Sequence, residues 1–209
     1  MGIMFSLYPV ESKERMRLIP LWLFVCLSLV RGDPSANWTA DYPPCNRHSE
    51  LLKQGHMDLG VRLATANPAL AQQFRLAMDS WATILDLEWH EDDTQNCSIE
   101  VVDGERDLFQ PLPQLIVARS QLPDRLDFQG WIAFNPAQTL DATELFWVAV
   151  HEIGHMLGLP HSSNAKSVMY GLSLDGLEWL VPTDLAALAA HHKLRIPDLD
   201  RPVQLIRRL

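Results

Sequence analysis

The chain has fewer basic than acidic residues, and the resulting negative charge argues against nucleic acid as a partner. The 209 residues include 17 lysines and arginines against 26 aspartates and glutamates, which gives a formal net charge of −9 at pH 7. Because phosphate binding requires a cationic surface, we expect no nucleic-acid partner. The chain also lacks internal repeats and low-complexity runs, and its length suits one domain of ordinary size.

Long apolar runs are also missing, apart from one near the N-terminus. Basic residues precede an apolar run at residues 18–30, and small residues follow it. This layout is typical of a secretory signal, and the run is too short for a comfortable membrane span. We therefore expect residues 1–32 to be a signal peptide, with Met16 as an alternative start, and the rest to be secreted without a membrane partner. The alternative is an uncleaved N-terminal membrane anchor.

Cysteine is scarce, with three residues in the whole chain. Cys26 lies inside the signal, which leaves Cys45 and Cys97. In an oxidising compartment two remaining cysteines most simply pair with each other. We therefore expect one disulfide between them.

The remainder divides into an arm, a domain and a tail. Residues 33–50 are polar and rich in proline, so they are expected to form an extended N-terminal arm. Apolar periodicity begins near Met57 and ends before Pro197. We expect a single domain at residues 51–197 and a short C-terminal tail at 198–209.

Periodicity predicts the elements of this domain in order. Residues 57–63 alternate between apolar and polar, which indicates a half-buried strand. Asn67 and Pro68 are typical of a helix N-cap and first turn, and apolar residues then recur at helical spacing up to Leu85. Four further short strands are predicted at residues 87–90, 97–101, 115–119 and 131–134.

Two more helices follow the strands. Asp141, with Glu144 three residues later, is typical of a capping box, and the next six residues are apolar nearly all round, so this helix is expected to be buried. Pro182 and Thr183 open the last helix. Together the elements predict an α+β fold, a twisted mixed sheet with two packed helices and a small C-terminal part holding the third.

The buried helix carries a metal-binding pattern. His151 and His155 are four residues apart, so both imidazoles point from one helix face toward one ion. Gly158 can leave the helix with positive φ, which lets His161 return as a third ligand. Three ligands leave a fourth position for water, and Glu152 is placed to accept a proton from that water. The pattern predicts one catalytic zinc and hydrolysis.

The histidine ligands also predict a pH dependence. Because each ligand must be neutral, we expect zinc affinity to fall as the pH approaches the ordinary histidine pKa of ~6.5.

This motif, with the stretch Ser167-Val168-Met169-Tyr170 after it, resembles the matrixin branch of the metzincin proteases. The likeness covers roughly residues 57–194. It implies the same fold as the element order does, with Met169 as the floor beneath the metal and Tyr170 beside it. It also implies that Asp184 steadies this turn; the alternative role of Asp184 is to complement the dipole of its own helix.

The resemblance further implies an extended peptide substrate bound along a sheet edge. The candidate edge strand comprises Leu115, Ile116, Val117, Ala118 and Arg119. Gly171 follows Tyr170 where matrixins commonly have proline, so the wall of the specificity pocket departs from the family pattern.

Two further metal sites need to be considered. Animal matrixins carry a structural zinc held by histidines upstream of the active-site helix. No histidine occurs between His90 and His151, so we expect no structural zinc. Asp103, Glu105 and Asp107 could supply oxygen ligands to calcium, although acidic loops are usually only solvated.

The resemblance also gives Cys45 an alternative role. Matrixins often remain latent because a propeptide cysteine occupies the fourth zinc position. The stretch around Cys45 lacks the family's arginine-and-glycine pattern, however, and the segment before the first strand is very short for a prodomain. A disulfide and a latency switch therefore both remain open for Cys45.

The combined prediction is a secreted, monomeric zinc endopeptidase that acts on proteins or peptides. Two alternatives remain. One is a secreted zinc-binding module without catalysis, although a structural site would not need Glu152. The other is a zinc amidase acting on a non-protein amide.

Overall fold

A computed structural model describes residues 2–4, 56–93, 99–111, 114–120, 130–171, 179–190 and 192–207. The expected signal peptide, apart from residues 2–4, and the expected arm lie outside these residues. So do Cys45 and Cys97 and any disulfide between them. No helix in the described part is long and apolar enough to cross a membrane.

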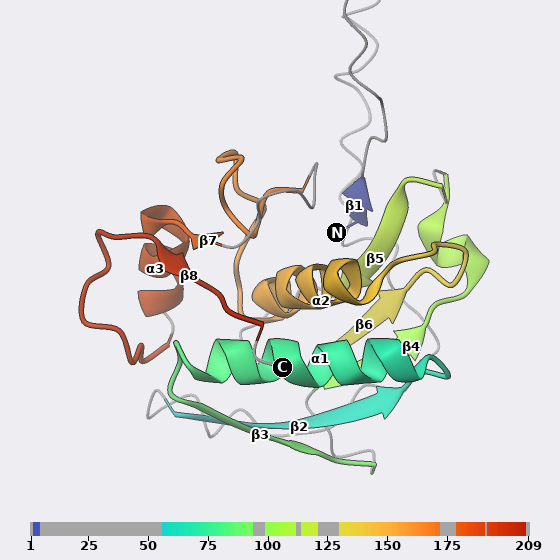
Figure 1. The fold of residues 1–209 in the computed structure, drawn as a ribbon, viewed down its shortest axis with the longest axis horizontal. Helices are drawn as coiled ribbons and strands as arrows, with labels where there is room; N and C mark the ends of the chain where they lie inside the picture. Colours follow the sequence, from blue (N-terminus) through green and yellow to red (C-terminus); the bar gives the residue numbers. More distant parts are fainter. Residues whose placement is uncertain are drawn as a thin grey trace, which may run out of the picture.

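A six-stranded mixed sheet forms one layer of the molecule (Figure 1). Its spatial order is β1-β5-β6-β4-β2-β3. The strands are β1 (Gly2–Met4), β2 (Met57–Ala64), β3 (Leu87–Glu91), β4 (Ile99–Asp103), β5 (Ile116–Ser120) and β6 (Gly130–Phe134). Strand β2 pairs in parallel with β3 and β4, and β4 with β6, whereas β5 runs antiparallel to β6. The predicted mixed sheet is confirmed.

Two long helices pack side by side against this sheet (Figure 1). Helix α1 (Pro68–Ala82) begins after Asn67, whose side chain accepts hydrogen bonds from the backbone N–H groups of Ala69 and Leu70. Its apolar stripe is buried as the helical spacing predicts. The indole N–H of Trp81 donates to the Val150 carbonyl of the second helix at 3.1 Å, which fixes the two helices together.

Helix α2 (Ala142–Met156) is the buried helix that carries the histidines. The Asp141 side chain accepts from the Thr143 and Glu144 N–H groups, and the Glu144 side chain accepts from the Asp141 N–H. This is the capping box that the sequence predicts. Every residue from Val148 to Met156 is buried, so packing holds the helix from all sides.

The small C-terminal part lies beyond the end of α2 (Figure 1). It contains β7 (Trp179–Leu180), α3 (Pro182–Ala189) and β8 (Val203–Gln204), with β7 and β8 paired antiparallel. Helix α3 is as predicted, but the two-residue strands are not, because so short a segment has no periodicity. After β8 the chain stays in contact with the domain: Leu205 is buried, and the Arg207 guanidinium donates to Gln73 Oε1 at 2.8 Å.

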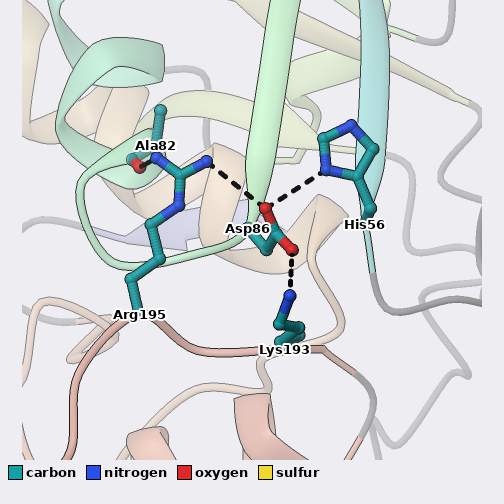
Figure 2. Close-up of polar contacts among 5 residues, drawn as sticks. All are labelled: His56, Ala82, Asp86, Lys193 and Arg195. Atoms are coloured by element: carbon teal, nitrogen blue, oxygen red, sulfur yellow. Dashed lines mark hydrogen bonds and ion pairs between the residues drawn. The ribbon is translucent and has the colours of Figure 1, made fainter.

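A charged cluster around Asp86 ties the chain after α3 to the first part of the sheet. The Asp86 carboxylate contacts Lys193 Nζ at 2.8 Å, His56 Nδ1 at 3.2 Å and an Arg195 nitrogen at 3.4 Å (Figure 2). Arg195 also donates to the Ala82 carbonyl at 3.0 Å. Asp86 lies between α1 and β3, so one carboxylate holds residues more than a hundred positions apart.

Candidate metal centre

Three histidines converge at the C-terminal end of α2. His151 and His155 lie one helical turn apart, and their ring centroids are 4.7 Å from each other. The His161 ring lies 4.7 Å from His155 and 5.2 Å from His151. One ring nitrogen from each residue lies within 4.8 Å of the others. The structure therefore brings together the three residues that the spacing predicts.

The turn after α2 gives His161 its position. Gly158 has a φ of 91°, a left-handed conformation that strongly favours glycine. The Leu159 N–H then donates to the Gly154 carbonyl at 2.9 Å, which closes the helix end. His192, three residues after the end of the last helix, donates through Nε2 to the Leu157 carbonyl at 2.8 Å. The turn is thus held both from within and by the C-terminal part.

Two backbone carbonyls orient the first two imidazoles. His151 Nδ1 lies 2.7 Å from the Val168 carbonyl, and His155 Nδ1 lies 2.7 Å from the Leu159 carbonyl. Because a carbonyl only accepts, each Nδ1 must carry the proton. Each Nε2 is then left with a lone pair, the form that binds a metal.

Burial also keeps these imidazoles neutral. It lowers the pKa of His151 to about 3 and that of His155 well below its usual value. It lowers the pKa of His161 to about 4. The sequence argument used the ordinary value of ~6.5, so the structure moves the expected loss of metal affinity to a more acidic pH.

The donor set fits a zinc ion. The Nε2 atoms of His151, His155 and His161 are buried and have no hydrogen-bond partner among the described residues. Buried polar nitrogens are almost always paired, so three orphans facing one point indicate a ligand that they share. Neutral imidazoles suit zinc among the common biological metals.

Glu152 lies next to the first ligand and is fully buried. Burial raises its pKa to about 7, and the hydroxyl of Ser120, at the end of β5, opposes part of that rise. A carboxyl group with such a pKa can both accept and release a proton near neutral pH. Sequence reasoning missed Ser120, because a serine at the end of a strand carries no signal of its partner.

The turn after His161 packs against α2 beside the histidines. Met169 is buried, and its sulfur lies against Gly154 on α2: a Cβ at Gly154 would come within 2.5 Å of it. Tyr170 follows it, half-buried against the core. The Ser167 hydroxyl accepts from the Met169 N–H at 2.9 Å and donates to Asp184 at 2.7 Å.

Asp184 links this turn to α3. The carboxylate oxygen that accepts from Ser167 also accepts from the Val181 N–H at 3.0 Å, at the start of the helix. Asp184 thus contacts the turn and also lies in the first turn of its own helix, so its position suits both roles considered for it. The sequence motif contains Ser167, but no pattern indicates that its hydroxyl joins the two elements.

The predicted edge strand is displaced by one residue. Leu115 lies in a turn before β5, and Ser120 belongs to the strand. On one side β5 pairs with β6, and on its outer side it pairs antiparallel with the residues of β1, Gly2 opposite Arg119 and Met4 opposite Ile116. Arg119 is half-buried, which lowers its pKa, while the charge of Glu152 raises it. In the described part, the edge proposed for substrate therefore carries the chain's own extended segment.

The acidic loop considered for calcium does not gather around one point. Asp103 instead accepts hydrogen bonds from the Thr65 hydroxyl at 2.6 Å and the Ala66 N–H at 2.8 Å, which holds the loop before α1. Within the described residues, the three histidines are the sole group of three or more metal-ligating side chains that could share an ion.

Comparison with known proteins agrees with this geometry. The matrixin peptidase family matches residues 61–176, more than half of the chain. The rat (Rattus norvegicus) "Macrophage metalloelastase" is 54% identical over 46 residues, which are 20% of this chain and 10% of that protein. The "Putative matrix metalloproteinase" of Spodoptera frugiperda ascovirus 1a is 59% identical over 29 residues, 14% of this chain and 8% of the viral protein. The matched segments thus cover about a tenth of the length of these relatives.

Proposed function

Because this chain belongs to the matrixin family, we propose that it is a zinc-dependent endopeptidase with Glu152 as the general base. One observation supports this most strongly: three neutral imidazoles with unpartnered Nε2 atoms lie beside a buried carboxyl group whose pKa is raised to about 7. A purely structural zinc site would have no use for such a carboxyl group. This favours catalysis over a zinc-binding module.

The three histidines would hold the zinc through Nε2, with Val168 and Leu159 fixing the ring orientation of the first two. When bound, zinc supplies a Lewis acid that polarises a carbonyl and lowers the pKa of water to about 7. Glu152 accepts the proton of the attacking water and delivers it to the leaving amine. Met169 and Tyr170 support the site from below, and Asp184 fixes them through Ser167.

The proposed substrate is a protein or peptide in extended conformation along β5. Support comes from β1, because residues 2–4 already pair with β5 as an added antiparallel strand. Backbone hydrogen bonds of this kind give affinity without regard to side chains. This edge favours a polypeptide over a non-protein amide, which would have no strand to offer.

The proposal includes secretion. If residues 1–32 are removed as a signal peptide, β1 leaves with them and the outer edge of β5 is open to substrate. If the leader is retained as an anchor, residues 2–4 compete with substrate for the same edge. The intact mass of the secreted protein distinguishes these two cases and also reports the state of Cys45 and Cys97. We further propose a monomer with one zinc and no structural zinc.

The substitution Glu152→Gln tests the proposed chemistry. The amide has nearly the same shape but cannot accept the proton, so kcat/KM on an unfolded protein substrate should fall by about 10²- to 10⁴-fold, the usual contribution of a general base. Zinc content and the thermal unfolding midpoint should be retained, because the substitution leaves the three histidines in place.

Glu88→Gln is the matched control, since Glu88 is an exposed glutamate on β3. It should leave turnover unchanged. Comparable hydrolysis by the Glu152→Gln variant would show that Glu152 is not the base. Absence of zinc-dependent hydrolysis in the wild-type chain would favour the non-catalytic module, and hydrolysis confined to non-protein amides would favour the amidase.

A further inference from the structure

The chain after α3 returns to the turn that lies beside the metal centre. Residues 198–209 are expected from the sequence to form a short tail, but β8 within them pairs antiparallel with β7 (Figure 1). On the opposite edge of β7, Trp179 forms a parallel bridge with Ser167 in the turn. Strand β7 therefore lies between β8 and the turn.

Val168 connects β7 to the first metal ligand. Its N–H donates to the Trp179 carbonyl at 2.8 Å, and its own carbonyl accepts from His151 Nδ1 at 2.7 Å. The hydrogen bond between Ser167 and Asp184, which also holds this turn, involves neither of these two groups. The backbone of β7 thus fixes the residue whose carbonyl orients the His151 ring.

Strand β8 supports β7 from its other edge. In an antiparallel pair, opposite residues alternate between those that exchange backbone hydrogen bonds and those that do not. Because Trp179 directs its carbonyl to the turn, Leu180 and Val203 form the pair that faces across β7 and β8 through backbone groups. The Trp179 side chain is 37% exposed, so packing gives this residue limited support. Backbone pairing on both edges is what holds it.

Both ends of the β8 segment are anchored to parts of the molecule outside the turn. Before β8, the Asp86 cluster holds the chain that leaves α3. After β8, Leu205 is buried in the main core. The Arg207 guanidinium then donates to Gln73 on α1 at 2.8 Å and to Thr143 on α2 at 3.2 Å. Strand β8 is therefore a fixed support and not a free end.

From these contacts we infer that β8 is a positioning element for the first metal ligand: it fixes β7, which holds Val168, whose carbonyl orients the His151 ring. This inference rests on the proposed zinc function and deepens it. His155 has a different support, because its Nδ1 bonds to the Leu159 carbonyl just beyond its own helix. Loosening β8 should therefore disturb the His151 ring and leave the His155 ring in place.

Val203→Pro tests this connection, because proline has no backbone N–H to offer to β7. Zinc affinity, measured by competition with a chromophoric chelator, should fall by about tenfold, the lower end of the range found when partners of metal ligands are altered. Nuclear magnetic resonance of zinc-loaded protein with isotopically labelled histidine gives the more specific readout. The Nδ1 hydrogen of His151 should exchange with solvent faster than in wild type, and that of His155 at the wild-type rate.

Two control variants separate this effect from a general loss of stability. Val203→Ala removes most of the side chain but keeps the N–H, so zinc affinity and both exchange rates should stay at their wild-type values. Leu87→Ala removes a buried side chain from β3, on the far side of the sheet from β5. It should lower the melting temperature and change the exchange of His151 and His155 equally.

Arg207→Gln loosens the same segment from its anchored end without inserting a proline, so it decides the question if Val203→Pro does not fold. It should also speed exchange at His151 alone, to a smaller degree. Wild-type exchange at His151 in the folded variant, or equal acceleration at His151 and His155, would overturn the inference. A wild-type chain that binds no zinc would instead overturn the proposed function, so the two failures are distinguishable.

Discussion

At each proposed metal ligand, burial decides the protonation state of the imidazole more than the ordinary pKa of histidine does. His151 shows this most clearly, because its ring lies in the core and its Nδ1 donates to the Val168 carbonyl. A buried imidazolium would be poorly solvated, so the neutral form persists to acidic pH. The site is therefore prepared for a metal over a wide pH range.

The lowered pKa values of the three histidines predict how zinc binding depends on pH. With ordinary pKa values of ~6.5, protonation of three histidines would weaken zinc affinity by about a thousandfold between pH 7.5 and 5.5. With the pKa of His151 lowered to about 3, that of His155 lowered well below its usual value and that of His161 to about 4, the loss over the same interval should be small. Affinity should fall steeply only as the pH approaches about 4.

Isothermal titration of metal-free protein with zinc at several pH values measures this dependence, with circular dichroism at each pH to show that the chain stays folded. A thousandfold loss by pH 5.5 in folded protein would mean that the imidazoles are more solvated than the structure shows.

At the scale of elements, the sequence predicts the helices and strands that depend on a local residue pattern. It misses the strands and contacts that depend on residues distant in the sequence. Helix α2 is predicted to its first residue, because Asp141 and Glu144 form a capping box from neighbouring positions. Strands β7 and β8 are not predicted, because two residues have no periodicity and their pairing joins segments over 20 residues apart. The contact of Ser120 with Glu152 is missed for the same reason.

The Asp86 cluster joins segments that are distant in the sequence, so only the folded chain reveals it. Hydrogen bonds from Lys193 and His56 hold the pKa of Asp86 far below its usual value. A carboxylate whose folded pKa is depressed adds stability above its unfolded pKa of about 3.9, and this stability is lost as the pH falls through the lower, folded pKa.

Asp86→Asn should therefore destabilise the metal-free protein at pH 7, and the difference from wild type should shrink as the pH falls below about 4. Urea unfolding at a series of pH values measures both effects. Asp200→Asn, at an exposed aspartate, is the control and should change stability little at any pH. A difference between Asp86→Asn and wild type that stays constant down to pH 3 would show that the carboxylate charge is not what stabilises this cluster.

At the scale of the whole molecule, the fold provides a rigid support for three side chains. The sheet and α1 bury α2 along its length, and the C-terminal part holds the turn after it through His192 and Asp184. The α+β class and the convergence of the histidines could be predicted, since both depend on spacing along the chain. The way in which the C-terminal part packs against α2 could not be predicted, because it depends on contacts between segments tens of residues apart.

The central claim is that three histidines bind one zinc ion, and X-ray absorption at the zinc edge tests it most directly. In the metal-loaded chain we predict one zinc per molecule, with three imidazole nitrogens at about 2.0–2.1 Å. In His161→Ala the imidazole count should fall to two. Zinc bound by fewer than three imidazoles in the wild-type chain, or a folded chain that retains no zinc, would contradict the account.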